Sequence, residues 1–381
     1  MYSVLDYGRM AADGVRMDAY ARAIARVVKP GSVVLDLGSG TGIFSLLAIR
    51  AGAKQVYAVD VNPAVWLLPD LAAENGAADR ITIHHGSSAE FDLPEKVDVI
   101  VSDMRGTSPL NGDHASAIRD ARARWLKPGG VLLPARDRLF VQVVESDDLT
   151  ARLTRGWESF ERLGFSANAA RTSILNTLYD DRTATLLASD VLTVPGAWGT
   201  LEYASYAGEV IDGTVDLTVT RNGTAHGLAV WFEATVFDDI AYRSAPGWTL
   251  AYARSYLPLL EPVRVTHGDR ARITMRADAR GDRWAWDTEL FGQDGASRAR
   301  FRQATFLGTP TAPAALRRSA TTHQPVPNAR GERLRTLLGA MDGQRTVAAL
   351  VAEVERTLPA GSPLRGELLE EVRDAVTRYA R

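Results

Sequence analysis

The chain has 381 residues, of which 46% are hydrophobic and 24% are charged, and its formal net charge is −2. These values are typical of a globular protein of about two to three domains and argue against a broad nucleic-acid-binding surface, so we expect no nucleic-acid partner. The absence of cysteine excludes disulfides and thiolate chemistry, and the six scattered histidines lack metal-ligand spacing, so we expect no metal.

The N-terminal stretch MYSVLDYGRMAADG lacks the basic and apolar regions of a signal peptide. No apolar run in the sequence approaches the ~20 residues that cross a bilayer. We therefore expect a cytoplasmic protein that has no membrane partner.

Residues 31–145 alternate short apolar runs with stretches of helical spacing. The apolar runs predict strands at Val33–Leu37, Gln55–Val59, Ile81–His84, Val97–Val101 and Val131–Leu133. Between these runs, apolar residues recur at helical spacing, as at Phe44, Leu47, Ala48 and Ala51. Strands and helices in alternation predict a mostly parallel sheet that has helices on both faces.

Residues from about 200 to 307 follow a different pattern, whereas residues 150–200 are mixed and do not indicate one type of structure. Segments such as TVDLTVT, GLAVWFEATVF and DRWAWDTEL alternate apolar and polar residues, which indicates an antiparallel sheet, sandwich or barrel. Residues 308–330 hold four prolines and little periodicity, as is typical of a linker. Residues 331–381 return to helical spacing and predict a helical tail.

A glycine turn joins the first predicted strand to the helix that follows it. Gly38, Gly40 and Gly42 follow a G-x-G-x-G spacing, whereas the dinucleotide fingerprint is G-x-G-x-x-G. Asp36 lies at the end of the strand, where a carboxylate suits a cationic ligand better than a pyrophosphate. This favours S-adenosylmethionine (SAM) over NAD or FAD and over a packing turn that holds no ligand. Asp60 ends the second strand, where an acid accepts ribose hydroxyls in doubly wound folds.

The segment VVLDLGSGTGIFSLLAIRAGAKQVYAVD resembles the cofactor motif of the protein arginine methyltransferases. Further segments are similar to that family in the same order: DYGRMAADGVRMDAYARAI, VDVIVSD, ARARWLKPGGVLLPARDRLFVQVVE, HGLAVWFEATV and LLEPVRVTHGD. The resemblance implies cofactor-lid helices over residues 1–30, a Rossmann-like SAM-binding domain over 31–145 and an antiparallel β-barrel domain over 146–307. It also implies a dimerisation arm over about 156–190, which begins with GWESFERLGFSANAAR, and hence a homodimer.

The resemblance also assigns cofactor-binding roles to residues whose motifs match. Arg16 would hold the SAM carboxylate, for which a bidentate arginine is well suited. Asp60 would accept from the ribose hydroxyls, and Tyr7 and Met10 would close a lid. The other implied contacts are Asp36, Gly38, Ser39, Gly40, Val61 and Ser88.

The acceptor side departs from the family pattern. The family's catalytic loop holds two glutamates that clamp a guanidinium, but SDMRGTSPLNGDHA has Asp103 at the first position and Gly112 at the second. Where the family has Thr-His-Trp, only an aromatic residue, Tyr252, remains. Arg105 adds a positive charge to the loop, and it would either contact an acidic or neutral acceptor or pair with a nearby acid. One Asp beside an Arg lacks the paired carboxylates that a guanidinium needs, so we expect Arg105 and Tyr252 to face a different acceptor.

Methyl transfer depends mainly on positioning, and it needs a base only where the nucleophile must lose a proton. Asp103 is the first candidate to orient the acceptor, and His114 and Asp113 are further catalytic candidates. The sequence thus indicates a SAM-dependent methyltransferase that has a diverged acceptor site and acts on a small molecule or a peptide. Two alternatives remain open: a peptidyl-arginine N-methyltransferase clamped by Asp103 and Asp113, and a SAM-binding or interaction protein without catalysis.

Overall fold

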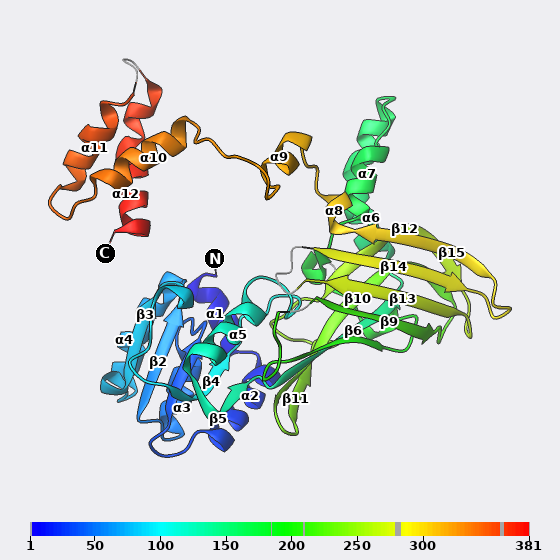
Figure 1. The fold of residues 1–381 in the computed structure, drawn as a ribbon. Coiled ribbons are helices and arrows are strands. Elements are labelled where there is room, and N and C mark those ends of the chain that lie inside the picture. The colour runs from blue at the N-terminus through cyan, green and yellow to red at the C-terminus, as the bar shows by residue number, and fades with distance from the viewer. Residues whose placement is uncertain (1, 184, 209, 279–282, 359–361, 381) are drawn as a thin grey trace. The chain divides into compact units, whose positions relative to one another are not determined.

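The computed structural model describes residues 2–183, 185–208, 210–278, 283–358 and 362–380. The chain divides into two compact units, residues 1–310 and residues 311–381 (Figure 1). The first unit carries the parallel and antiparallel sheets, and the described part of the second is helical.

The first sheet of the first unit is parallel, with five strands in the order β3-β2-β1-β4-β5. Its strands are β1 (Val33–Leu37), β2 (Gln55–Asp60), β3 (Ile81–His85), β4 (Val97–Ser102) and β5 (Leu126–Leu133). Every predicted strand is present, but β5 begins ahead of its apolar run because Leu126 pairs with Val97 through the backbone, which the side-chain pattern does not reveal. The strand order reverses between β1 and β4, where such sheets bind ligands at the carboxyl ends of the strands.

Helices accompany this sheet in the order that the sequence predicts. They are α1 (Val4–Ala11), α2 (Gly14–Val27), α3 (Ile43–Arg50), α4 (Leu68–Glu74) and α5 (His114–Trp125), with 3-10 turns at Pro63–Leu67, Ala78–Arg80 and Ser88–Glu90. Helix α1 begins at a capping box, in which the side chains of Ser3 and Asp6 each bond the other's backbone. Helix α2 buries one face, including Tyr20 and Ile24.

The remaining strands form two antiparallel sheets, as the alternating pattern from about residue 200 predicts. The strand Arg136–Val144 also belongs to them, although it lies within the range expected for the parallel-sheet domain, because its backbone pairs with later strands. The larger has the order β7-β12-β10-β6-β8 with β11 paired to β10, and the smaller has the order β15-β14-β13-β9. Trp198 of the larger sheet meets Trp284 of the smaller edge to face, with ring centres 5.7 Å apart, so aromatic side chains fill the space between the sheets. The strands are β6 (Arg136–Val144), β7 (Tyr179–Asp180), β8 (Gly196–Glu202), β9 (Ile211–Thr218), β10 (Gly223–Phe237), β11 (Ile240–Arg243), β12 (Ser255–Val265), β13 (Arg270–Ala277), β14 (Trp284–Phe291) and β15 (Ser297–Ala304).

Helices α6 (Asp147–Arg162) and α7 (Asn168–Leu175) lie between β6 and β7, where the arm is expected. Helix α6 begins at Asp147, ahead of the expected arm, and runs unbroken through Gly156. Two aspartates occupy the first turn of α6, and negative charge is favourable at a helix N-terminus.

The second unit has its own hydrophobic core. Its helices are α9 (Pro313–Arg318), α10 (Ala329–Ala340), α11 (Val347–Glu355) and α12 (Leu368–Tyr379), with a 3-10 turn at Pro363–Gly366. Helices α10, α11 and α12 share a core that includes Leu337, Leu350, Val354, Leu368 and Val372. The boundary between the units therefore falls inside the expected linker, after α8 (Thr305–Gly308), but α9 interrupts that linker. Pro313 stands in the first turn of α9, where proline is tolerated.

Candidate cofactor and acceptor site

The site lies at the carboxyl ends of β1 and β4, beneath α1 and beside the acceptor loop, which comprises residues 103–113. In the turn after β1, Gly38 and Gly40 have φ values of +75° and +54°, a region that favours glycine. A Cβ atom would lie 2.2 Å from Met104 Cγ at Gly38 and 2.3 Å from Tyr7 Cε1 at Gly40. The bare turn therefore allows both α1 and the acceptor loop to approach the strand ends.

Three polar atoms near these strand ends are buried without a hydrogen-bond partner in the described part of the chain: Asp36 Oδ1, Ser39 Oγ and Ser102 Oγ. The other oxygen of Asp36 accepts from Ser45 Oγ at 2.6 Å. Burial raises the pKa of Asp36 to about 7. Since buried polar atoms normally have partners, these atoms fit a polar ligand, and a carboxylate among them fits one that carries positive charge.

Asp60, at the end of β2, is oriented by two backbone donors. Gly40 N donates to its Oδ2 and Asn62 N to its Oδ1, both at 2.6 Å. Burial and the neighbouring Asp60 carboxylate raise the pKa of Tyr7 to about 12. The Tyr7 ring thus lies over the glycine turn near Asp60, which agrees with the expected lid and ribose acceptor.

Three further predicted cofactor contacts lie at the margin of this region. Val61 is 63% exposed. The half-buried Ser88 uses its carbonyl to accept from Arg124 Nη2 at 2.5 Å, and the Met10 carbonyl accepts from Arg16 Nη1 at 3.1 Å. Their contacts with a cofactor stay predictions.

Arg16 joins the cofactor side to the acceptor side. Its Nε donates to Asp103 Oδ2 at 2.5 Å and to the Tyr252 hydroxyl at 3.1 Å, and its Nη1 donates to the Met10 carbonyl. Of the three nitrogens of the Arg16 guanidinium, Nη2 is the one that has no hydrogen-bond partner among the described residues. The two-donor grip expected on a cofactor carboxylate therefore requires Arg16 to release one of these contacts.

Asp103 differs from a free catalytic carboxylate. Its side chain is 1% exposed. Its Oδ2 accepts from Arg16 and from the Tyr252 hydroxyl, and its Oδ1 accepts from Arg105 Nη1 at 3.0 Å. Burial alone would raise the pKa of Asp103, but the two arginines outweigh burial and lower that pKa to about 2. Asp103 is thus a poor proton acceptor at neutral pH, and its contribution is position and charge.

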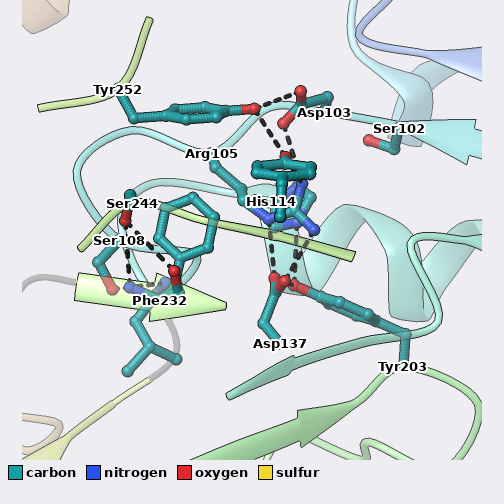
Figure 2. A network of polar contacts seen from close by, with 12 residues as sticks. Ser102, Asp103, Arg105, Ser108, His114, Asp137, Tyr203, Phe232, Ser244 and Tyr252 are labelled. Carbon is teal, nitrogen blue, oxygen red and sulfur yellow. Dashed lines mark hydrogen bonds and ion pairs between the residues drawn. The ribbon is translucent and has the colours of Figure 1, made fainter. Parts of the chain in front are cut away.

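Arg105 is enclosed between two carboxylates, as Figure 2 shows. Its Nε and Nη2 donate to the two oxygens of Asp137, each at 2.8 Å, in a bidentate fork. Its Nη1 donates to Asp103 and, at 2.9 Å, to the Tyr20 hydroxyl. The side chain is 0% exposed. Of the two roles expected for Arg105, the structure therefore supports pairing with nearby acids and corrects the expected contact with an acceptor.

His114 and Asp113 lie apart from Asp103. The Nε2 atom of His114, the first residue of α5, is 3.0 Å from the Tyr203 hydroxyl, and burial holds the pKa of His114 well below its ordinary value. This neutral, buried imidazole reaches Asp103 only through Tyr203, Asp137 and Arg105. Asp113 is exposed at the N-cap of α5 and makes no capping hydrogen bond. Direct catalytic roles for these two residues do not agree with this geometry, so both expectations are corrected.

Tyr252 lies against Asp103, and its expected contact with an acceptor stays a prediction. It belongs to the loop of residues 244–254, which connects β11 to β12, and its hydroxyl donates to Asp103 Oδ2. The same hydroxyl is 3.1 Å from that of Tyr242. Burial, followed by the Asp103 charge, raises the pKa of Tyr252 well above its ordinary value, so Tyr252 remains a hydrogen-bond donor at neutral pH.

A buried ion pair anchors the loop that carries Tyr252. Arg254 Nη1 donates to Asp181 Oδ2 at 3.0 Å, and both side chains are at most 3% exposed. Arg254 Nε donates to the Ser244 carbonyl at 3.0 Å, and Arg254 N donates to Asp181 Oδ1 at 2.8 Å. Since Asp181 follows β7 at the base of the arm, the loop that positions Tyr252 is tied to the arm.

Four residues of the acceptor network were not found from the sequence: Tyr20, Asp137, Tyr203 and Tyr242. Asp137 lies in β6 at 0% exposure, although the alternation Arg136, Asp137, Arg138 resembles a solvated stretch. The sequence carries no signal for this residue, because nothing in that alternation indicates that Asp137 is a buried acid in need of a partner.

A cavity of about 510 Å³ adjoins the acceptor loop. It is lined on one side by Thr107, Asn111 and Gly112 and on the other by residues 177–180, Thr305 and Thr309. Hydroxyl and amide groups dominate the lining, and Asp180 is the charged residue in it. The cavity therefore suits a polar ligand.

Within the described ranges, no group of three or more His, Asp or Glu side chains is arranged to hold a metal ion. Of the helices in those ranges, none has both the length and the apolar character for a membrane span.

The chain is similar to known methyltransferases. A family model described as a methyltransferase domain matches residues 34–130. Protein arginine N-methyltransferase 6 of Xenopus tropicalis is 30% identical over 233 residues, which cover 59% of this chain and 68% of that relative. The Danio rerio protein of the same name is 31% identical over 236 residues, or 59% and 67% of the two chains. Protein arginine N-methyltransferase PRMT10 of Oryza sativa subsp. japonica is 40% identical over 149 residues, or 38% and 39%.

Solved structures share the fold. Arabidopsis thaliana protein arginine methyltransferase 10 aligns with a TM-score of 0.67 and 21% identity over 79% of this chain and 97% of that one. The Trypanosoma brucei PRMT1 enzyme-prozyme heterotetrameric complex with AdoHcy aligns with a TM-score of 0.63 and 22% identity over 78% and 97%. At these identities the likeness supports the architecture alone.

The parallel sheet, its bare glycine turn and the unpartnered polar atoms at its edge define a SAM-dependent methyltransferase, and the matching methyltransferase model agrees. SAM is therefore its cofactor, and the contacts of Asp36, Arg16 and Asp60 with that molecule stay predictions. The identity shared with relatives of known name further shows that the chain belongs to the protein arginine N-methyltransferase family. The resemblance inferred from the sequence is thus confirmed.

Proposed function

We propose that this protein transfers the methyl group of SAM to an acceptor other than peptidyl arginine. The observation that carries the proposal is the Arg105 guanidinium, which already lies between Asp103 and Asp137 and bonds both. An incoming guanidinium would compete for Asp103 with Arg105, Arg16 and the Tyr252 hydroxyl. The two arginines balance the two aspartates, so the site has no excess negative charge to attract a cation.

The proton chemistry of the site favours a nucleophile that is unprotonated near pH 7. Bound SAM supplies an activated methyl group on a sulfonium. Asp103, whose pKa is lowered to about 2 by Arg16 and Arg105, does not take up a proton there. His114 is buried, and its Nε2 bonds Tyr203 and not Asp103. We infer that the acceptor atom attacks without first losing a proton, as a carboxylate oxygen or an uncharged amine nitrogen does.

The cavity beside the acceptor loop supports a small-molecule acceptor, with a peptide as the alternative. Its volume of about 510 Å³ lies within the roughly 300–1,000 Å³ that is common for small-molecule sites. Gly112 forms part of its wall, and a Cβ atom there would meet nothing within 4 Å. Because Gly112 stands at the position of the family's second glutamate, the space that a side chain would occupy there is open. Asp113, exposed at the N-cap of α5, gives no support to a rearranged guanidinium clamp.

We further propose that the arm forms a homodimer. Trp157 and Phe160 of α6 pack edge to face with ring centres 5.6 Å apart, although both are more than a third exposed. Leu163 and Phe165 extend this apolar face at 73% and 59% exposure. A second copy would cover it. Sedimentation velocity should give a dimer for the wild type and a monomer for Trp157→Glu with Phe160→Glu; a monomeric wild type would refute the assembly.

Methyl transfer from isotopically labelled SAM tests the acceptor. An arginine-rich peptide should remain unlabelled, whereas small carboxylates and amines from a cell extract should include a labelled product identified by mass spectrometry. Calorimetric binding of S-adenosylhomocysteine serves as the control that the cofactor site is intact. Labelling of peptidyl arginine at a rate equal to or above that of every small molecule would overturn the proposal.

A further inference from the structure

We propose that the acceptor side contains a complete guanidinium-binding site that is filled by the chain's own Arg105. Arg105 and Asp137 would then be the residues that determine specificity, because together they close this site to any guanidinium from outside. The inference rests on the proposed function and deepens it, since it names the ligand class that the site excludes and the groups that exclude it.

The contacts of Arg105 complement a guanidinium from three sides. Asp137 accepts from Nε and Nη2 at 2.8 Å each, and Asp103 accepts from Nη1 at 3.0 Å. The hydroxyls of Tyr20 and Tyr242 lie 2.9 Å and 3.3 Å from the same Nη1. Because the Tyr20 hydroxyl donates to the Ser102 carbonyl at 3.0 Å, its oxygen is oriented to accept.

The face of the guanidinium is covered as well. The Arg105 Cζ atom lies 5.4 Å from the centre of the Phe232 ring, within reach of a cation–π contact. All of these contacts involve the planar head group. A free guanidinium ion therefore matches the same partners without the chain's own tether.

Asp137 depends on Arg105 more than Asp103 does. Arg16 would still bond Asp103 at 2.5 Å if Arg105 were absent. Asp137 would keep the hydrogen bond that it accepts from the Tyr203 hydroxyl. Within the described residues, however, Asp137 makes no ion pair other than the one with Arg105. Removing the Arg105 side chain should thus leave an empty, negatively charged space of guanidinium shape.

Chemical rescue tests this site. The melting temperature of the variant Arg105→Ala is measured in 0–20 mM guanidinium chloride, about two orders of magnitude below denaturing levels. Sodium chloride at the same concentration controls for ionic strength, and urea controls for a neutral molecule of the same shape. We expect guanidinium alone to raise its melting temperature saturably, by about 2–4 °C. The wild type should not respond, and neither should Arg105→Met, which fills the space with an apolar chain. An equal response of Arg105→Ala to guanidinium and sodium would overturn the proposal.

A second measurement covers the case in which Arg105→Ala does not accumulate in folded form. The variant is then refolded by dilution from urea, with and without guanidinium. A concentration of roughly 10 mM suits the weak binding that is expected of so small a cation. A higher yield of S-adenosylhomocysteine-binding protein with guanidinium supports the site, and equal yields refute it. Labelling of an arginine peptide by the wild type would instead refute the proposed function, whereas rescue by guanidinium would still establish the site.

Discussion

Asp36 lies near the end of β1 and Asp103 follows the adjacent strand β4, yet their surroundings move their pKa values in opposite directions. Asp36 has one hydroxyl partner, and burial raises its pKa to about 7. Asp103 is equally buried, but Arg16 and Arg105 lower its pKa to about 2. Asp103 is therefore charged at any physiological pH, whereas Asp36 exchanges its proton near neutrality.

The pKa of Asp36 predicts a pH-dependent stability. An unfolded aspartate loses its proton near pH 4, whereas folded Asp36 keeps its proton up to about pH 7. Between these values the folded state binds more protons, so stability falls as pH rises, by up to roughly 1.4 kcal/mol per pH unit. Asp36→Asn cannot ionise and should lack this slope. Urea unfolding at pH 5, 6 and 7 measures it; equal slopes for both proteins would contradict the prediction.

At the scale of elements, the turn after β1 depends on close approach by α1. Gly40 and Gly112 have similar φ values of +54° and +61°, but a Cβ atom would lie 2.3 Å from the Tyr7 ring at Gly40 and would meet nothing within 4 Å at Gly112. Both substitutions to Ala carry a similar backbone strain of about 1 kcal/mol.

Gly40→Ala should therefore weaken binding of S-adenosylhomocysteine at least tenfold by displacing Tyr7, whereas Gly112→Ala should retain it. Titration calorimetry provides the comparison, with urea unfolding to separate the shared strain from the loss of ligand. Equal affinities in the two variants would show that α1 does not need the bare turn.

A second feature at the scale of elements is the connection between the arm and the loop of residues 244–254. Asp181→Asn removes the charge that pairs with buried Arg254, and breaking a buried pair costs about 3–5 kcal/mol. Asp180→Asn is a matched control, since the Asp180 pair with Arg182 is 3.7 Å long and largely exposed, where pairs contribute about 0–1 kcal/mol. Urea unfolding should separate the two variants. If they are equally stable, Asp181 does not anchor the loop.

The elements also explain how far the sequence could be interpreted. The strands of the parallel sheet were predictable because burial on both faces makes β1 apolar apart from Asp36. The Arg105 network was not, because Asp137 comes from β6, Tyr203 follows β8 and Tyr242 lies in β11. Local sequence gives no sign that these side chains converge. The sequence of the acceptor loop was therefore compatible both with Arg105 contacting an acceptor and with Arg105 pairing with a nearby acid.

At the scale of the whole molecule, the two units have separate cores. A chain that ends at Pro310 should therefore fold and bind S-adenosylhomocysteine with unchanged affinity, and calorimetric melting should lose one of the two transitions of the full chain. Aggregation of the shortened chain, together with a single transition in the full chain, would show that the units depend on each other.

The buried position of Arg105 also has a consequence for competition. A group that is covalently tethered beside its binding site has an effective concentration on the order of millimolar or higher, which dilution does not change. Free arginine therefore competes with the Arg105 side chain, which cannot diffuse away from the site. Substrate selectivity is set by the fold and does not change with the concentration of arginine in the surroundings.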